Sequence, residues 1–223
     1  MIKVVSLDIL DLIGFQSGVL FVLRETQNND SVKVSFYSFD IETKSIATVT
    51  KNAYLLTKFG SAYAPIAKQL GDYVSCDAAK LWNGHTFIIY STGETGIFDE
   101  HGNLIKTSDL LYKDSPARDV AVDNNYIWSV VPEHNLIIKY SLLQNRVIMR
   151  IGGEDSETFS QPVSVSEYDG YLYVCNKKSK KIKRIDLKNF LVEDYKEFDE
   201  AVYNYVRVDN SEFVILDSGV YLL

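Results

Sequence analysis

The chain of 223 residues has few side chains that could bind a metal or cross-link it, since it contains only two cysteines and three histidines. A zinc site needs about four ligands, so Cys76 and Cys175 do not predict a metal site. We expect both thiols to be reduced and to lie in different repeats, as small apolar residues rather than a disulfide. We also predict no cofactor.

Long apolar runs and excess positive charge are also missing. No stretch of about 18 apolar residues occurs, so we expect no membrane-spanning helix. The first apolar run, from Met1, ends at Asp8, and Asp11 follows, which argues against a secretion signal. The net charge of -7 opposes general attraction to nucleic acid or to anionic membranes. We therefore expect a cytoplasmic protein that binds no membrane and for which nucleic acid is not the main partner.

What the sequence does contain is a strand-turn-strand pattern that recurs at intervals of about 41 to 46 residues. One copy has strands at Val120 to Val130 and at Ile137 to Leu142. The next copy has strands at Pro162 to Val165, Tyr171 to Val174 and Ile182 to Leu187. This period is typical of the blades of a β-propeller.

The remaining segments fit the same pattern and predict five groups of strands, at about residues 9–50, 73–107, 116–151, 161–196 and 203–223. The last group is one strand short, and Ile2 to Ser6 can supply that strand, which would leave no free sheet edge. We therefore predict an all-β, five-bladed β-propeller that forms a single domain over residues 1–223, with the N-terminal strand closing the last blade. A β-sandwich is the competing all-β fold, but it does not predict a regular four-strand repeat.

Three features of the fourth group carry a family resemblance: Pro162 with the strand after it, the Asp169-Gly170 turn, and the basic residues in the strand from Ile182 to Ile185. They resemble the NHL and YVTN repeats of β-propellers. The resemblance covers the third and fourth groups well and the fifth in part. It implies a propeller fold and, for most members, an interaction platform, with a minority of lactonase-like or other enzymes.

In such a fold, the loops between second and third strands and the connections between blades emerge on one face, around the central channel. We call this side the loop face. The candidate ligand-binding residues expected there are Arg24, Arg118, Glu133, His134, Asn176 and Lys177. The connection from Tyr54 to Leu70 is unusually long; it is a candidate lid, or an insertion that packs its apolar residues on the rim.

Carboxylates could also lie near the central channel. Asp11, Asp77 and Asp119 each stand near the start of a first strand. Two of them could serve as acid and base in a glycosidase. Alternatively, they cap turns or pair with Arg118 and Arg207. The three histidines are expected to be solvated turn residues that form neither a triad nor a metal centre.

The basic run from Lys177 to Arg184 is the strongest charge feature. It could contact RNA phosphates, with Tyr171 or Tyr173 stacking on bases, or it could be a solvated surface or a site for an acidic partner. The sequence favours a non-enzymatic binding module whose partner is a protein, a peptide or a small ligand. The alternatives are a hydrolase in the channel, glycosidase or lactonase-like, and an RNA-binding propeller.

Overall fold

The computed structural model describes residues 1–6, 9–15, 18–26, 32–48 and 76–223. Strands and turns make up almost all of these residues, and the one helix among them is the short 3-10 helix η1 at Pro132–His134. Among the described residues there is no helix with the length and apolar character needed to span a membrane. The predicted lid from Tyr54 to Leu70 lies outside the described residues.

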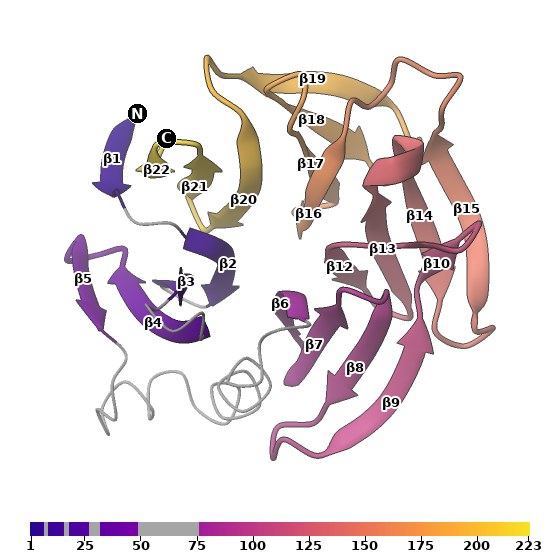
Figure 1. The fold of residues 1–223 in the computed structure, drawn as a ribbon, viewed down its shortest axis with the longest axis horizontal. Helices are drawn as coiled ribbons and strands as arrows, with labels where there is room; N and C mark the ends of the chain where they lie inside the picture. Colours follow the sequence, from indigo (N-terminus) through magenta and orange to yellow (C-terminus); the bar gives the residue numbers. More distant parts are fainter. Residues whose placement is uncertain (7–8, 16–17, 27–31, 49–75) are drawn as a thin grey trace.

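Five antiparallel sheets of four strands each contain most of the described residues (Figure 1). In four of the sheets the strands follow chain order. These sheets are β2(Ile9–Phe15), β3(Gly18–Thr26), β4(Val32–Asp40) and β5(Ser45–Thr48); β6(Cys76–Trp82), β7(His85–Tyr90), β8(Glu94–Phe98) and β9(Leu104–Asp109); β12(Val120–Asp123), β13(Tyr126–Val131), β14(Leu136–Ser141) and β15(Arg146–Gly152); and β16(Pro162–Tyr168), β17(Tyr171–Asn176), β18(Lys181–Asp186) and β19(Val192–Glu197). The remaining sheet has the order β1(Ile2–Val5), β22(Gly219–Leu222), β21(Ser211–Leu216) and β20(Val202–Val208).

The strands β2, β6, β12, β16 and β20 lie nearest the middle of the molecule (Figure 1). We call each of them the first strand of its sheet, and in the last sheet β21, β22 and β1 are then the second, third and fourth strands. β2 contacts β6, β6 contacts β12, β12 contacts β16, β16 contacts β20, and β20 contacts β2. The contacts between sheets therefore run round a closed ring. This arrangement confirms the prediction of an all-β, propeller-type fold.

The sheets hold together through apolar side chains on both of their faces. Phe87 and Ile89 of β7 belong to the same buried cluster as Ile127 of β13 and Ile138 of β14. Burial on both sides explains why these strands have continuous apolar runs instead of alternating ones. Where the first and last sheets meet, the rings of Phe39 and Phe213 pack edge to face with their centroids 5.3 Å apart.

The two ends of the chain pair in one sheet. β1 pairs with β22 in antiparallel register, with Ile2 opposite Leu222 and Val5 opposite Val220. The sequence predicted this pairing from the missing strand of the last group. Gly219, at the start of β22, has a φ of +135°, and a Cβ atom there would lie 2.2 Å from the Val5 carbonyl oxygen.

A short hairpin, β10(Leu111–Tyr112) and β11(Ser115–Pro116), forms a separate two-stranded sheet. It lies in the connection between β9 and β12, where the sequence suggested only a loop. The free thiol of Cys175 is fully buried, as expected. The side chain of Cys76 lies outside the described ones, so the separation of the two thiols stays a prediction.

Gly219→Ala should destabilise the protein more than Gly153→Ala does. Both glycines have a similar positive φ, +135° and +141°, so both substitutions introduce backbone strain, but a Cβ at Gly153 meets no atom within 4 Å. The extra cost at Gly219 comes from displacing Val5, and we expect it to be about 1 to 3 kcal/mol in the free energy of unfolding. Urea denaturation of the two variants measures the difference, and equal losses would contradict a contribution of the β1 pairing to stability.

Candidate functional site

Two buried carboxylates meet near the middle of the ring. The exposed fractions of Asp11 and Asp119 are only 1% and 3%. The Lys80 Nζ lies 3.3 Å from Asp119 Oδ1 and 3.8 Å from Asp11 Oδ1. The sequence placed these carboxylates near the channel and suggested arginine partners, whereas the ammonium group between them is that of Lys80.

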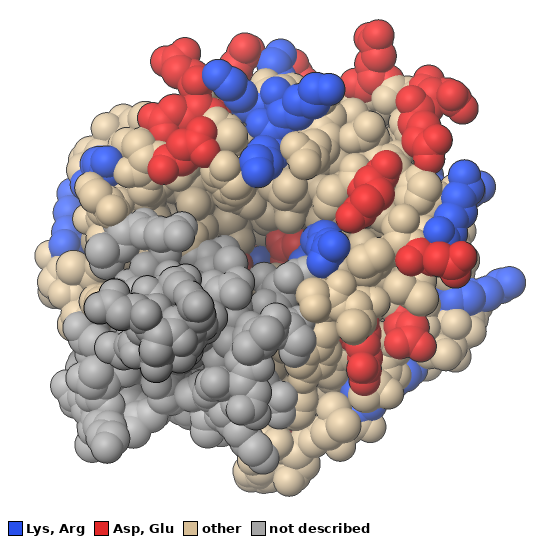
Figure 2. Space-filling view, in the orientation of Figure 1, with Lys and Arg blue, Asp and Glu red and all other residues tan. Residues whose placement is uncertain are grey.

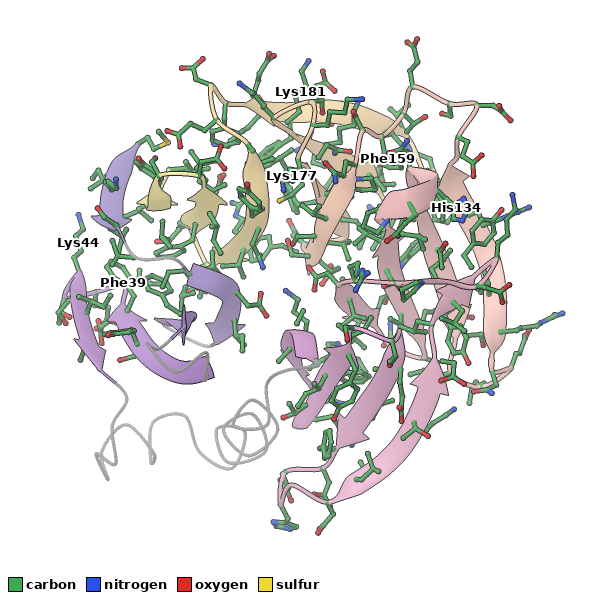
Figure 3. The ribbon with its side chains drawn as sticks, in the orientation of Figure 1. Phe39, Lys44, His134, Phe159, Lys177 and Lys181 are labelled. Carbon is green, nitrogen blue, oxygen red and sulfur yellow. The ribbon has the colours of Figure 1, made fainter. Side chains whose placement is uncertain are left out.

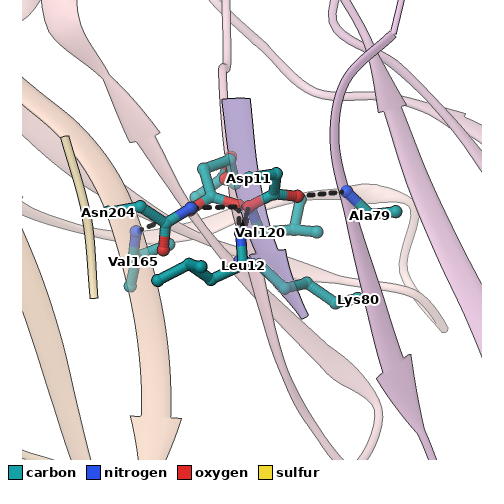
Figure 4. Close-up of polar contacts among 9 residues, drawn as sticks. Asp11, Leu12, Ala79, Lys80, Val120, Val165 and Asn204 are labelled. Carbon is teal, nitrogen blue, oxygen red and sulfur yellow. Dashed lines mark hydrogen bonds and ion pairs between the residues drawn. The ribbon is translucent and has the colours of Figure 1, made fainter. Parts of the chain in front are cut away.

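Each carboxylate joins two neighbouring sheets (Figure 4). Asp11 of β2 accepts one hydrogen bond from the amide of the residue after it, at 2.9 Å, and one from the amide of Ala79 in β6, at 3.0 Å. Asp119, just before β12, likewise accepts a hydrogen bond from the amide of the next residue, at 2.7 Å, and one from the amide of Val165 in β16, at 2.9 Å. Both oxygens of each carboxylate are therefore used within the protein.

Asn204 extends this arrangement to the last sheet. Its Nδ2 donates to Asp11 Oδ1 at 2.5 Å, which connects β20 to β2 (Figure 4). We call Asp11, Lys80, Asp119 and Asn204 the axial latch. Because the latch spans contacts between several sheets, it ties the first strands together round the ring.

Asp77 does not occupy the equivalent position. β6 has a bulge between Cys76 and Ala78, just as β2 has one between Ile9 and Asp11, so Ala78 lies opposite Ile89 as Asp11 lies opposite Val22. The amide that binds Asp11 is that of Ala79, the residue after Ala78. Ala78 therefore stands where the other sheets carry Asp11 and Asp119, and the side chain of Asp77 is outside the described ones.

Burial and charge set the ionisation of the latch. Burial raises the pKa of Asp11 to about 6, although Lys80 lowers it in part. Burial alone would lower the pKa of Lys80, but the carboxylates of Asp11 and Asp119 outweigh it and raise that pKa above its ordinary value. Lys80 is therefore a charged ammonium group held between two acceptors, which is the arrangement a buried charge requires.

Asp119→Asn should lower the free energy of unfolding by about 2 to 4 kcal/mol. The side-chain amide of the new asparagine has only one acceptor oxygen, so one of the two backbone amides bound by Asp119 loses its acceptor. The substitution also removes one of the negative charges that face Lys80. Asp123→Asn is the matched control, because Asp123 is half-buried at the end of the same strand and binds only the Asn124 side chain among the bonds described. We expect the control to change stability by less than about 0.5 kcal/mol. Similar losses in urea denaturation of both variants would contradict the latch.

The pKa of Asp11 predicts a pH effect on stability. Its ordinary value is 3.8 and its value in the folded protein is about 6, so the folded state binds the proton more tightly. The stability contributed by this group is fully present below about pH 3.8 and is lost as the pH rises through about 6. The free energy of unfolding of the wild type minus that of Asp11→Asn should therefore fall between about pH 4 and pH 7. A difference that rises with pH would contradict the raised pKa.

On the side of the turns between first and second strands, the ring opens into a pocket of about 320 Å³. Its lining includes Lys80 and the half-exposed Arg207, but neither Asp11 nor Asp119. The Arg207 guanidinium lies 4.6 Å from the ring centre of Tyr168. This pocket is on the face opposite to the one the sequence favoured, and Asp11 and Asp119, two of the three candidate catalytic carboxylates, do not line it.

On the loop face, two predicted residues come together. Arg118 Nη2 lies 3.6 Å from Glu133 Oε1, and Arg118 Nη1 donates to the Ser91 carbonyl oxygen at 3.1 Å. Glu133 belongs to η1, in the loop between the second and third strands of its sheet. Both side chains are substantially exposed, at 35% and 45%, so they remain within reach of a partner.

His134, the next residue of η1, is not a solvated turn residue, and this expectation was wrong. Only 16% of its side chain is exposed. Its Nε2 lies 3.1 Å from Ser115 Oγ, its Nδ1 is hydrogen-bonded to Glu154 Oε1, and its ring packs edge to face against Tyr112. The error arose because these partners come from the unpredicted β10 and β11 hairpin and from the connection after β15. His101 behaves as predicted, since 74% of its side chain is exposed.

Asn176 and Lys177 lie on the neighbouring sheet. Asn176 is fully buried, its Oδ1 accepts from the Ser160 amide and its Nδ2 donates to the Val174 carbonyl oxygen, both at 3.0 Å. These bonds hold the connection before β16 in place. Lys177 Nζ lies 4.8 Å from the ring centre of Tyr203 (Figure 3). Arg24 belongs to β3, but its side chain is not among those described.

Three residues of the basic run, Lys181, Lys183 and Arg184, are paired with carboxylates of their own sheet. Lys181 Nζ lies 2.8 Å from Asp194 and 3.3 Å from Glu197, and Lys183 Nζ lies 2.8 Å from Asp194. Arg184 forms an ion pair with Glu193. These carboxylates belong to β19, the outer strand, and Figure 2 shows basic and acidic side chains interspersed at the top of the view, where Figure 1 places β18 and β19. Much of the positive charge is therefore neutralised locally.

The sequence analysis did not name four residues of these sites as candidates: Lys80, Ser115, Glu154 and Asn204. A lysine among the apolar residues of a first strand, as in Ala79-Lys80-Leu81, is a usable signal for a buried ion pair, because an unpaired charge is rarely buried. No local signal identifies Ser115 or Glu154, since each meets His134 only through the packing of separate segments.

No known protein family matches the sequence, and no curated protein matches it. Solved structures match the fold. The WD40 β-propeller domain of Doa1 has a TM-score of 0.56 and 12% identity, covering 96% of this chain and 62% of that chain. A chain of the mitotic checkpoint complex has a TM-score of 0.51 and 10% identity, covering 96% and 58%. Sqt1 of Saccharomyces cerevisiae has a TM-score of 0.50 and 10% identity, covering 95% and 71%.

These similarities define the class of the protein by its fold, which is that of a β-propeller. The chain spans 62% of the Doa1 domain and 58% of the matching chain in the checkpoint complex. Identities of 10% to 12% carry no information on ligands or activity.

Proposed function

We propose that this chain is a binding module, a single five-bladed propeller of NHL-like repeats in the cytoplasm, which presents its loop face to a protein or peptide. Five four-stranded sheets and a closed ring of contacts between their first strands support five blades. One of the similar chains is part of a complex, the mitotic checkpoint complex, which agrees with a role in binding.

The observation that carries the proposal is the charge of the loop face. Its loops and connections carry a set of exposed carboxylates: Asp114, Glu133, Glu154, Asp155, Glu157, Asp199 and Asp217. Among the described residues of the same loops and connections, the basic side chains are fewer: Lys113, Arg118, Lys177, Lys178 and Lys180. Arg118 and Lys177 already contact Glu133 and Tyr203. Acidic loops attract positively charged partners through long-range electrostatics. The partner that fits this face is therefore a peptide segment rich in lysine and arginine.

The alternatives from the sequence find less support. A glycosidase in the channel needs two carboxyl groups that can exchange protons with a substrate, whereas the oxygens of Asp11 and Asp119 are bound to backbone amides. An RNA-binding surface on the basic run needs free cations, whereas Lys181, Lys183 and Arg184 are paired with carboxylates of β19.

A library of random peptides displayed on phage tests the proposal. We expect the selected peptides to be enriched in lysine and arginine and to bind more weakly as the salt concentration rises. In the double variant Asp155→Lys, Glu157→Lys their affinity should fall by about tenfold or more, equivalent to about 1.4 kcal/mol. Both residues are exposed, so the fold should be unaffected.

The matched control is the double variant Glu42→Lys, Glu100→Lys. It makes the same change in charge at exposed positions in turns between third and fourth strands, on the opposite face. Its affinity should stay within about twofold of the wild type. Equal losses in both double variants, or a selection that yields no peptide above background, would refute a binding site on the loop face.

A further inference from the structure

Ser115, His134 and Glu154 form a chain of hydrogen bonds on the loop face. Ser115 lies on β11, His134 ends η1, and Glu154 follows β15. Ser115 Oγ is 3.1 Å from His134 Nε2, and His134 Nδ1 is hydrogen-bonded to Glu154 Oε1. The two ring nitrogens thus contact a hydroxyl on one side and a carboxylate on the other, the order found in serine hydrolases.

The protons on this chain can be assigned from the partners. The bond from His134, and beside it Lys113, hold the pKa of Glu154 below its usual range, so its carboxylate is ionised at neutral pH and can only accept. Nδ1 must therefore donate to Glu154. In the neutral ring Nε2 then carries no proton, and it accepts the hydroxyl proton of Ser115. This is the state in which a histidine activates a serine.

Backbone contacts hold Glu154 in place next to this ring. Gly152 has a φ of +85°, and a Cβ there would lie 2.6 Å from the Phe159 ring and 2.7 Å from the Asn135 carbonyl oxygen. The Gly153 amide donates to that same carbonyl oxygen at 3.1 Å. Phe159, labelled in Figure 3, is buried. The segment carrying the carboxylate is therefore packed against the loop that carries the histidine.

A pocket of about 260 Å³ adjoins the imidazole. Its lining includes His134, Glu154, the apolar Leu136 and the cation Lys113. Ser115 itself is not among the residues that line this pocket, which is bounded instead by the segment around Glu154.

We propose that Ser115 is the nucleophile of an acyl-transfer site that hydrolyses small esters. Ser115 Oγ attacks the ester carbonyl carbon while its proton passes to His134 Nε2. The bond to the leaving alkoxide then breaks, and the alkoxide takes that proton and departs as an alcohol. Water attacks the acyl-serine with His134 again as base, which releases the carboxylic acid and restores Ser115. Glu154 is a positioning residue that keeps Nε2 free of a proton.

This chemistry goes beyond the binding function and does not depend on it. A fluorophosphonate probe tests it on the full chain, because such a probe labels serines that are activated by a neighbouring base. We expect one label per chain, located at Ser115 by peptide mass spectrometry and absent from Ser115→Ala. The labelling rate should fall about 100-fold or more in His134→Gln, since a general base contributes factors of about 10² to 10⁴.

Two further variants separate reactivity from folding. Ser156→Ala is the matched control, because Ser156 lines the same pocket and binds Thr158 rather than His134, and it should label at the wild-type rate. With p-nitrophenyl acetate as substrate, Glu154→Gln should lower kcat by about tenfold or more and leave KM within about twofold, since the carboxylate orients the ring. Because 59% of the Glu154 side chain is exposed, this variant should fold normally.

The proposal would be overturned by the absence of a label at Ser115 in the folded wild type, by labelling of Ser115 at an unchanged rate in both His134→Gln and Glu154→Gln, or by equal labelling of several serines. None of these results would affect the peptide-binding proposal, which is measured separately.

Discussion

The structure depends on a side-chain carboxylate that reaches from one first strand to the backbone of the next. First strands in a propeller converge on the axis without pairing with one another, so the amides that face the channel need acceptors from elsewhere. Asp119 meets this need for Val165, and Asp11 meets it for Ala79. Each buried amide left without an acceptor would cost about 1 to 3 kcal/mol. Lys80 then allows both carboxylates to stay buried, because its ammonium group contacts the two of them.

The polar groups that stabilise the fold and those that we assign to function lie in different parts of the molecule. The axis holds charged side chains whose partners are internal, while the loop face holds exposed carboxylates and the bonded set of Ser115, His134 and Glu154. Loops on a rigid propeller can change without disturbing the sheets. Asn176 links the core to this face, since its buried side chain fixes the connection before β16 and the next residue is the half-buried Lys177 of the loop face.

Much of the fold could be predicted from the sequence, because a repeat of four apolar strands is a strong local signal. The pairing of β1 with β22 also followed from a missing strand. Side-chain partners from different sheets could not be predicted. In β6, as in β2, a bulge at the start of the strand sets the register, so the residue equivalent to Asp11 is Ala78 and not Asp77. A register that differs by one residue turns every side chain to the other face. The basic run looked unpaired because Asp194 and Glu193 lie on the next strand, where only the hairpin register brings them opposite Lys183 and Arg184.

Amide hydrogen exchange at Val165 and Ala79 tests the bridging carboxylates most directly. In the wild type both amides should exchange as slowly as those in the buried strand β13, because each donates to a buried carboxylate. In Asp119→Ala the protection of Val165 should fall strongly while that of Ala79 persists, since Asp11 still accepts from Ala79. Rapid exchange of both amides in the wild type, or unchanged protection of Val165 in the variant, would contradict the account.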